Sequence, residues 1–362
     1  MNRQLSRSIL SINLIGWDNE GGLSTDIGIL ERILSECGCR VLFNGHRARR
    51  PGGAAKRLIR SAALRVQHGM ASVSGRPICS VNLFIESISP KAIRFGRLNC
   101  FIPNPEWFRE ENMPYLPAMD MVLCKTHDAV ATFRPLAQDT RYVGFTSTDR
   151  LEPDILRSNE LLCLHAAGAS PSKGTSAVVE TWRRHPEWPR LVVIRSPAWY
   201  SGEAVPKEPT APNIEYVIAR LDDRTWRRYQ NTCEVHVCPS EAEGFGHIIV
   251  EAMSCAALVI TTDGPPMNEL VTTDRGVLVS YARSEPMRLG SSYFVDVDDL
   301  ERQVGRVLKM EERERRALGG NARNWYESQS RAFENAVRNL VDEVWPEQIA
   351  RKSCERICSP SA

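Results

Sequence analysis

Long apolar runs are absent from this chain of 362 residues. No run approaches the roughly 18 apolar residues that a membrane-spanning helix requires, so the sequence predicts no such helix. The N-terminal stretch MNRQLSRSILSINLIGW has arginines near a short apolar run, but it lacks a small-residue cleavage site and continues into a predicted strand. We therefore expect no signal peptide.

Metal-binding spacing is also missing among the eleven cysteines. Cys37 and Cys39 are separated by one residue and Cys354 and Cys358 by three, and no matching pair with histidines follows. Free cysteines in apolar strands behave as small hydrophobic residues. These patterns predict reduced thiols, no metal site and a cytoplasmic protein.

A strong net charge is absent too, because the formal total is only +2. The charge is unevenly spread, since the charged residues of RARRPGGAAKRLIRSAALR, from Arg47 to Arg65, are all basic. One interpretation is a solvated loop and helix face. The other is a local site for a polyanion, an anionic membrane surface or a phosphorylated acceptor, with the protein at the inner face of the membrane.

What the chain does contain is two series of alternating strand and helix signals, the pattern of open parallel α/β sheets. The first series fills residues 1–150 and the second residues 159–321, with a polar linker at residues 146–159. After the short strand GVLVS we expect helices at about 298–318 and 322–344, and then a tail at 345–362. The predicted fold class is α/β, with two Rossmann-like domains facing each other across a cleft.

Four loops directly follow predicted strands, where open parallel sheets bind ligands. In the first, Gly21 and Gly22 let the backbone approach a phosphate or sugar, although an ordinary tight turn has the same sequence. In the second, HAAGASPSKGT, Lys173 stands at a helix start, which suits a phosphate contact or an ordinary surface lysine. In the fourth, TTDGPPMNELV, two prolines precede Glu269 and suit a rigid binding wall or a structural turn.

The third loop, PSEAEGFGHIIVEAMSC, carries two glutamates with seven residues between them. Gly244 and Gly246 leave amides free at a helix start, and Glu251 lies inside that helix with its side chain directed back toward the start. A carboxylate so placed can accept hydrogen bonds from a ribose diol, while Glu243 outside the helix can reach a second polyol. The alternative is that Glu243 only caps the helix dipole.

Together these stretches resemble the donor site of retaining glycosyltransferases with the GT-B fold, in particular family 4. The resemblance lies in a strand followed by Pro-Ser, Glu-Gly-Phe-Gly and Glu-Ala-Met, then a strand ending in Thr, a loop and Glu. It is strong from about Leu161 to Val279 and fainter before Asn159. It also implies that the helix at 322–344 crosses back onto the N-terminal domain.

The resemblance implies a role for each candidate residue. Glu251 holds the ribose of a nucleotide sugar. Glu243 and the amides of three neighbours hold the transferred sugar, and these neighbours are Gly244, Phe245 and Gly246. Lys173 and the Gly21–Gly22 loop face the diphosphate. Glu269 matches the acid that follows the family's glycine-rich donor loop.

Two departures from the family pattern matter. Ala169 and Ser170 follow Gly168, where the family usually has an arginine, and Arg195 stands where a glycine is common. We expect Arg195 to supply the missing cation from the neighbouring strand. Many relatives also carry a histidine near the sugar, and Glu86 takes that position here, unless it is simply a satisfied polar residue at a strand end.

The resemblance implies a glycosyltransferase that moves a hexose from a nucleotide-diphosphate sugar, of the UDP-glucose or GDP-mannose type, to a hydroxyl acceptor. The implied acceptor is a glycan or glycolipid, with retention of configuration and neither metal nor other cofactor. For acceptor contact we consider Glu106, Trp107 and Phe108, which suit sugar stacking or a hydrophobic plug. The alternatives are the same chemistry on a modified nucleic-acid base, and a non-catalytic nucleotide-sugar or glycan-binding module. A dinucleotide oxidoreductase is disfavoured because the first strand lacks Gly-x-Gly-x-x-Gly.

Overall fold

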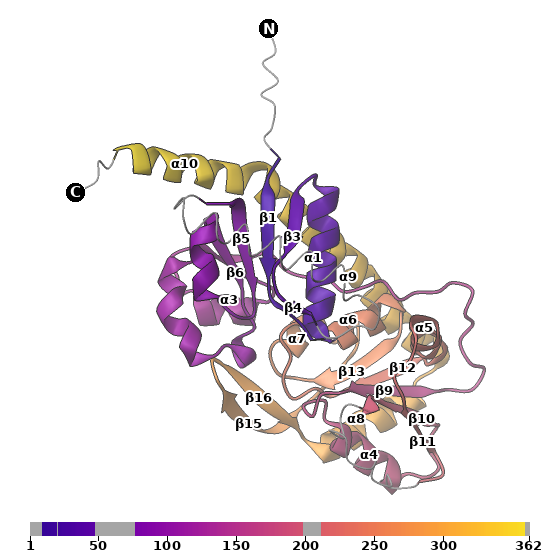
Figure 1. The fold of residues 1–362 in the computed structure, drawn as a ribbon. Helices are drawn as coiled ribbons and strands as arrows, with labels where there is room; N and C mark the ends of the chain where they lie inside the picture. Colours follow the sequence, from indigo (N-terminus) through magenta and orange to yellow (C-terminus); the bar gives the residue numbers. More distant parts are fainter. Residues whose placement is uncertain (1–8, 20, 48–76, 198–210, 359–362) are drawn as a thin grey trace. The chain divides into compact units, whose positions relative to one another are not determined.

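The computed structural model describes residues 9–19, 21–47, 77–197 and 211–358 (Figure 1). Contacts divide the chain into two units. Unit 1 comprises Met1–Phe145 and Arg331–Ala362, and unit 2 comprises Thr146–Ser330. The chain is α/β throughout, with one six-stranded parallel sheet in each unit.

Unit 1 has its strands in the order β3-β1-β5-β6-β7-β8. They are β1 (Ser11–Ile15), β3 (Arg40–Phe43), β5 (Cys79–Ile85), β6 (Gly96–Ile102), β7 (Met121–Cys124) and β8 (Thr140–Tyr142). Its helices are α1 (Gly22–Glu36), α3 (His127–Phe133) and α10 (Trp345–Cys358), with 3-10 turns at Pro90–Phe95, Pro105–Trp107 and Glu110–Ala118. The short strands β2 (Trp17–Asp18) and β4 (His46–Arg47) pair with each other.

A ladder of buried asparagines crosses three central strands of unit 1. Asn13, Asn82 and Asn99 are in register on β1, β5 and β6. The Asn13 amide donates to Asn82 at 2.8 Å, and the Asn82 amide donates to Asn99 at 2.8 Å. Buried amides need partners, so a one-residue slip of any strand would leave one unsatisfied. The ladder therefore specifies the register of this sheet.

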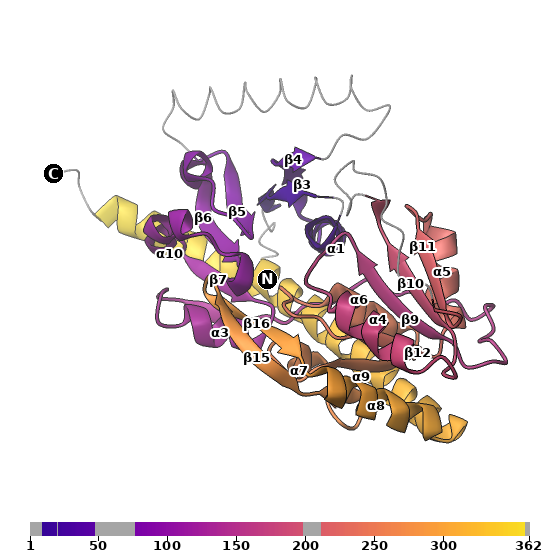
Figure 2. The same cartoon turned by 90° about the horizontal axis from the view of Figure 1, so that it is seen from below.

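Unit 2 has the strand order β11-β10-β9-β12-β13-β14. The strands are β9 (Cys163–Gly168), β10 (Leu191–Arg195), β11 (Ile214–Ile218), β12 (Val235–Cys238), β13 (Leu258–Thr262) and β14 (Val277–Val279). The helices are α4 (Thr175–Arg184), α5 (Asp223–Thr232), α6 (His247–Ser254), α7 (Met267–Leu270), α8 (Val297–Lys309) and α9 (Glu312–Asn339). The antiparallel hairpin of β15 (Tyr281–Met287) and β16 (Gly290–Val295) is drawn in orange in Figure 2.

Successive strand residues in unit 2 face opposite sides of the sheet, as the two-residue period requires. Val193 of β10 packs with α4 and α8, which lie side by side (Figure 1), and Val192 and Ile194 pack toward α5. Both sides are thus covered, which explains why these strands read as continuous apolar runs. None of the described helices is both long and apolar enough to span a membrane.

Two sequence-based expectations about the C-terminal third are wrong. The strand GVLVS does not lead directly to a helix, because the hairpin β15–β16 comes first. The helix break expected between 318 and 322 is also absent, since α9 continues through Gly319 and Gly320. A Cβ on Gly319 would lie 2.2 Å from the backbone oxygen of Ala256, so this glycine permits close packing and does not end the helix.

The helical part of the chain also extends further than expected. After α9 the backbone forms a π-helical turn at Leu340–Val344 and then α10, which includes most of the expected tail at 345–362. The chain re-enters unit 1 at Arg331, within α9.

Candidate active site

The strand order of unit 2 creates a switch point between β9 and β12. From β9 the chain adds β10 and β11 on one side of the sheet, and β12, β13 and β14 extend the other side. The loops that follow β9 and β12 therefore leave in opposite directions. Ligands of open α/β sheets bind at such points, at the carboxyl ends of the strands.

Lys173 and Glu243 meet at this switch point. Lys173 lies in the loop after β9 and Glu243 in the loop after β12, and the ammonium group forms an ion pair with Oε1 of the carboxylate. The hydroxyl of Ser240 donates to the same oxygen at 2.6 Å. The side chains are 17% and 9% exposed, so the pair is largely desolvated but still reachable from solvent.

Close backbone contacts fix these two loops to each other. Gly174 has φ 66°, and a Cβ there would lie 2.2 Å from the backbone oxygen of Pro239. The amide of Glu241 donates to the backbone oxygen of Ser172 at 2.9 Å. The glycine beside Lys173 is therefore required by both its left-handed backbone and the lack of space.

The glycine turn before α6 has the conformation that the sequence indicates. Gly246 has φ 103°, and a Cβ there would lie 2.7 Å from Cδ1 of Leu270 in α7. No side chain caps the start of α6. Phe245 is buried, so its ring belongs to the core and only its backbone can serve a ligand. Gly244 and Gly246 flank that backbone.

Glu251 lies inside α6 and is 6% exposed. Its Oε1 accepts from Arg150 at 3.3 Å and from Ser147 at 3.5 Å, and its Oε2 accepts from Gln230 at 3.0 Å. Each carboxylate oxygen has two lone pairs, so acceptor capacity remains on Oε2.

Two residues that donate to this carboxylate also have a buried polar atom of their own without a hydrogen-bond partner. Among the described residues, Nε of Arg150 and Oε1 of Gln230 are buried without a hydrogen-bond partner. Buried polar groups without partners are rare and often mark functional sites. Arg150 and Ser147 belong to the predicted linker, and no sequence signal there identifies them, because they lie about a hundred residues before α6.

His165 of β9 forms a hydrogen bond with Thr175, the first residue of α4. Its Nδ1 is 2.7 Å from the backbone oxygen of Val237, which can only accept, so Nδ1 carries the proton. Its Nε2 accepts from the hydroxyl of Thr175 at 2.9 Å. Burial, together with the smaller effect of the Arg195 and Lys173 charges, lowers the pKa of His165 to about 4.

Arg195 is the last residue of β10 and pairs in register with Gly168 of β9. The register shifts just before it, and Gly168 has φ 57°. Both Arg195 and Lys173 act electrostatically on His165, so two cations gather near the carboxyl end of β9.

Glu269 lies in the short helix α7, after the loop that follows β13. That loop contains a cis peptide bond between Pro265 and Pro266. The side chain of Glu269 is partly buried, and its backbone oxygen accepts from Arg275 at 3.1 Å. Lys173, Arg195, Glu243 and Glu269 thus all lie at or after the carboxyl ends of unit 2 strands, the first and third in loops, Arg195 at the end of β10 and Glu269 in α7.

Three predicted site residues belong to unit 1. Gly22 begins α1, and the amide of Gly21 donates to Asn19 at 2.9 Å. Glu86 follows β5 in a left-handed conformation with φ 64°, and its Oε2 accepts from Asn104 at 2.9 Å. A left-handed backbone is uncommon for a glutamate and occurs preferentially at functional sites.

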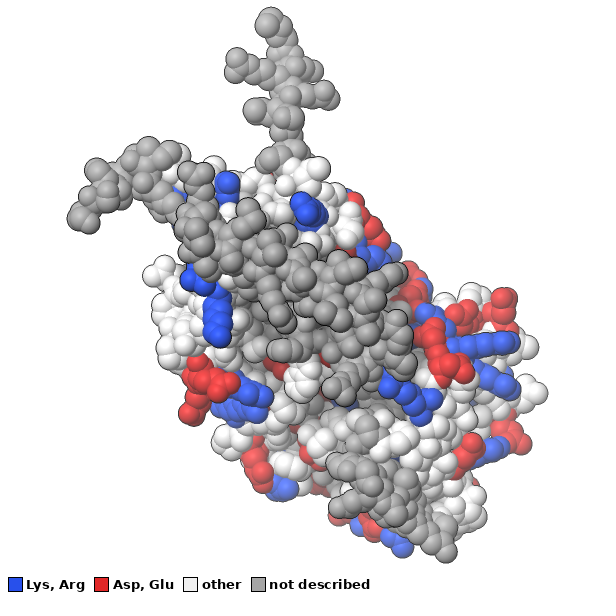
Figure 3. All heavy atoms as spheres, viewed as in Figure 1, with Lys and Arg blue, Asp and Glu red and all other residues white. Residues whose placement is uncertain are grey.

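The remaining sequence-based candidates differ in their exposure to solvent and in whether the structure describes them. Phe108 is buried against Phe101 and Phe133 and is therefore a hydrophobic plug. Trp107 is partly exposed. The basic segment lies outside the described residues except for Arg47 at its start. On the described surface in Figure 3, basic side chains lie among acidic ones.

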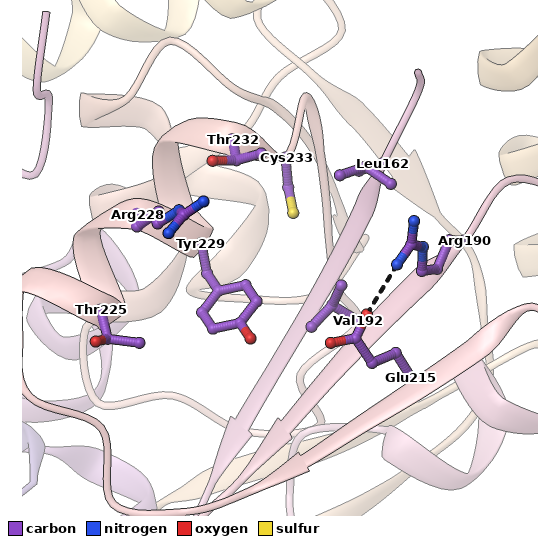
Figure 4. Close-up of a pocket in the computed structure, with 9 residues that line it drawn as sticks. All are labelled: Leu162, Arg190, Val192, Glu215, Thr225, Arg228, Tyr229, Thr232 and Cys233. Carbon is purple, nitrogen blue, oxygen red and sulfur yellow. Dashed lines mark hydrogen bonds and ion pairs between the residues drawn. The ribbon is translucent and has the colours of Figure 1, made fainter. Parts of the chain in front are cut away.

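The cavity in Figure 4 lies at the other edge of the unit 2 sheet. It has a volume of about 370 Å3, and Tyr229 from α5 lies opposite the ion pair of Arg190 and Glu215. Leu162 and Cys233, which also line it, precede β9 and β12. This cavity is therefore at the amino ends of the strands and shares no residue with the switch point.

Part of the chain matches a known protein family. Residues 211–325 match the family described as glycosyl transferases group 1, and this range includes Glu243, Glu251 and Glu269. Lys173 and Arg195 precede the matched range. No curated protein sequence matches the chain.

Solved structures show the same fold at low sequence identity. A sucrose-phosphate synthase from Thermosynechococcus elongatus superposes with a TM-score of 0.68 and 16% identity, covering 93% of this chain and 100% of that one. A trehalose 6-phosphate synthase from Burkholderia multivorans has a TM-score of 0.62 and 13% identity, covering 98% and 100%. Anabaena HepE in complex with UDP-glucose has a TM-score of 0.58 and 14% identity, covering 96% and 100%.

These neighbours have the GT-B fold, which agrees with the two parallel sheets described above. The matched domain contains the glycine turn and both glutamates of the switch-point loop. The chain is a glycosyltransferase with a group 1 domain in its C-terminal half.

Proposed function

We propose that the chain transfers a hexose from a nucleotide-diphosphate sugar to a hydroxyl of a glycan or glycolipid, with retention of configuration. The observation that carries this proposal is the ion pair of Lys173 and Glu243 at the switch point of unit 2. A cation for a diphosphate and a carboxylate for a sugar hydroxyl stand together there. The solved structure of HepE with UDP-glucose supports a donor of the UDP-sugar type.

The donor lies across the start of α6 in this proposal. Glu251 accepts hydrogen bonds from the ribose hydroxyls, supported by the acceptor capacity left on its carboxylate and by the unsatisfied atoms of Arg150 and Gln230. Glu243 and the amides of the 244–246 turn bind the hexose. Glu269 borders the sugar from the start of α7.

Lys173 and Glu243 neutralise each other in the free chain. Donor binding replaces that pair with two new ones, the ammonium with the diphosphate and the carboxylate with a hexose hydroxyl. Hydrogen bonds in which one partner is charged are stronger than those between neutral groups. The ammonium and the carboxylate therefore each keep a strong hydrogen-bond partner in this buried setting. Arg195 adds a second cation from the end of β10, in place of the arginine that the family usually has after Gly168.

Transfer breaks the bond between the sugar C1 and the diphosphate oxygen, and the electron pair leaves with that oxygen. The acceptor oxygen forms the new bond to C1 on the same face and gives its proton to the departing phosphate. The developing negative charge is stabilised by Lys173, Arg195 and the amides at the helix starts. These residues supply preorganised charge, and no covalent intermediate on Glu243 is part of the proposal.

In unit 1, Glu86 is the proposed acceptor-side or sugar-side contact. Its left-handed backbone holds it at the end of β5, and Asn104 occupies one of its carboxylate oxygens. The Gly21–Gly22 turn is the proposed diphosphate contact of this unit. Anionic lipid or another polyanion as a partner of the Arg47–Arg65 segment remains a separate proposal, tested by vesicle binding with and without anionic lipid.

The function is tested by nucleotide release. The chain is incubated with UDP-glucose, GDP-mannose or UDP-N-acetylglucosamine, with and without a cell extract as the acceptor source, and free UDP or GDP is quantified. We expect release with one donor, increased by the extract. Thermal shift measured with the same three donors identifies the bound one, because a ligand of the folded state raises its stability.

Tight nucleotide binding without release from any donor would contradict transfer and favour a non-catalytic binding module. Incorporation of labelled sugar into nucleic acid, with none in glycan or lipid, would overturn the acceptor class and leave the chemistry intact.

A further inference from the structure

The hairpin β15–β16 is an addition to the parallel sheet of unit 2. It lies between β14 and α8, and the amide of Asp296 donates to the backbone oxygen of Ser280 at its base at 2.8 Å. Most of β15 is exposed. The hairpin contributes little to the core, so its contacts with other elements are informative about its role.

One residue of the hairpin is bonded to the loop that carries Glu243. The amide of Tyr293 donates to the backbone oxygen of Glu241 at 2.7 Å. The amide of Glu241 in turn donates to Ser172, which precedes Lys173. A continuous chain of backbone hydrogen bonds therefore links the hairpin to the loops after β12 and β9.

The ring of Tyr293 rests on a third loop. A Cβ added to Gly264, in the loop after β13, would lie 2.5 Å from Cγ of that ring and 2.8 and 3.0 Å from its two Cδ atoms. The ring thus packs directly against the glycine backbone, with no space for a side chain. Gly264 begins the segment that leads through Pro265 and Pro266 to Glu269.

The neighbouring aromatic residue has a different environment. Phe294 follows Tyr293 on β16, so its side chain points to the opposite face of the hairpin. The guanidinium of Arg283 lies 3.6 Å from the centre of the Phe294 ring. No described contact joins Phe294 to the three loops, which makes it a matched control for Tyr293.

We propose that Tyr293 is a positioning residue for the sugar part of the donor, holding the loops after β9, β12 and β13 at the spacing that the hexose requires. This inference rests on the proposed function. It assigns the hairpin to the sugar and not to the nucleotide, because Glu241 is two residues from Glu243. The described partners of Glu251, by contrast, come from the linker and α5.

The test compares two dissociation constants by titration calorimetry. The first constant is for the nucleotide sugar, and the second is for UDP or GDP alone. The nucleotide sugar used is whichever of UDP-glucose, GDP-mannose and UDP-N-acetylglucosamine binds the wild-type chain. Tyr293→Ala should weaken nucleotide-sugar binding about tenfold, the effect of losing one contact between coupled groups, and leave UDP or GDP binding unchanged. Phe294→Ala should change neither constant.

Gly264→Ala approaches the same contact from the other side. The added methyl group has no space beside the ring, so this variant alone should also weaken nucleotide-sugar binding. Combined with Tyr293→Ala, the methyl group enters the space that the ring leaves, and binding should recover toward the wild-type value. Tyr293→Phe keeps the ring and the backbone amide and should behave as wild type.

Equal effects of Tyr293→Ala and Phe294→Ala, or equal weakening of nucleotide sugar and nucleotide by Tyr293→Ala, would overturn the inference alone. If Tyr293→Ala does not fold, the single variant Gly264→Ala replaces it in the test. That variant should weaken nucleotide-sugar binding and leave UDP or GDP binding unchanged, and equal weakening of both would overturn the inference. Absence of binding by the wild-type chain to all three nucleotide sugars would remove the proposed function and this inference together.

Discussion

Each parallel sheet has a lysine–carboxylate pair near the carboxyl ends of its strands, and the two pairs differ in exposure to solvent. In unit 1, Lys125 follows β7 and contacts Asp26 of α1 at 2.6 Å, with both side chains 2% exposed. In unit 2, Lys173 contacts Glu243 with side chains 17% and 9% exposed. The first pair is sealed within its unit, whereas the second can be reached by a ligand.

The difference shows that the same chemical pair can serve structure or binding. A sealed pair compensates charges that cannot return to water, so it contributes to the fold only while both members are present. A pair that solvent reaches, at a switch point with a second cation nearby, can exchange its partners for those of a ligand. The following predictions test this distinction, beginning with the largest expected effect.

Breaking the sealed pair should reduce stability strongly. Asp26→Ala leaves the ammonium of Lys125 buried without its partner, and we expect a loss of about 3–5 kcal/mol in the free energy of unfolding. Urea unfolding measures this loss. The double variant Asp26→Leu with Lys125→Met removes both charges and should recover most of the stability. If Asp26→Ala were as stable as wild type, the pair would not be structural.

Breaking the accessible pair should instead reduce the rate. Lys173→Ala removes a cation from the leaving diphosphate, and we expect nucleotide release to slow by roughly 10²–10³-fold. The free energy of unfolding should fall by less than it does for Asp26→Ala, because Glu243 keeps the hydrogen bond from Ser240 and its carboxylate still reaches solvent. Lys309→Ala, at an exposed lysine at the end of α8, is the control and should release nucleotide at the wild-type rate. A large stability loss without a rate effect would reverse the distinction.

The two units illustrate what the sequence can and cannot predict. The alternation of apolar strands and helices predicts two α/β sheets, because burial on both sides gives continuous apolar runs. Glu243 and Glu251 lie in one short stretch, so their spacing around the glycine turn is visible in the sequence. Lys125 and Asp26 are 99 residues apart, and no local pattern connects them.

The hairpin was missed for a different physical reason. β15 contains Pro286, which argues against a strand unless the strand is at an edge, as it is in this two-stranded hairpin. The turn that follows contains Arg288 with φ 56°, where a glycine would have been the usual signal. Likewise, Gly319 indicated a helix end, although its actual role is close packing on Ala256.

Acidification should lower the free energy of unfolding through His165, which lies beside the loop that carries Lys173. Burial lowers the pKa of His165 to about 4 from 6.5, so the neutral form stabilises the fold fully above pH 6.5, and this contribution is lost as the pH falls toward 4. Between pH 7 and pH 5 we expect His165 to account for a loss of about 2 kcal/mol. His165→Asn should unfold with a shallower dependence on pH over this interval, by an average of roughly 0.7 proton. His236, whose pKa burial also lowers to about 4, would maintain the remaining slope in that variant. Equal slopes for wild type and His165→Asn would contradict the assignment.

Removing the second cation should affect the donor less than removing Lys173 does. Arg195 lies one strand from Lys173, and a hydrogen bond to a charged group contributes about 1.5–3 kcal/mol, so Arg195→Ala should weaken donor binding at least about tenfold. Calorimetry with the donor measures the change, and Arg190→Ala, at the amino end of the same strand, is the matched control. If Arg195→Ala bound the donor as wild type does while Lys173→Ala abolished binding, Arg195 would not replace the arginine that the family carries after Gly168. A tenfold loss would show instead that the unit 2 edge holds its anionic ligand with two cations, whereas the sealed pair of unit 1 uses one lysine for one carboxylate.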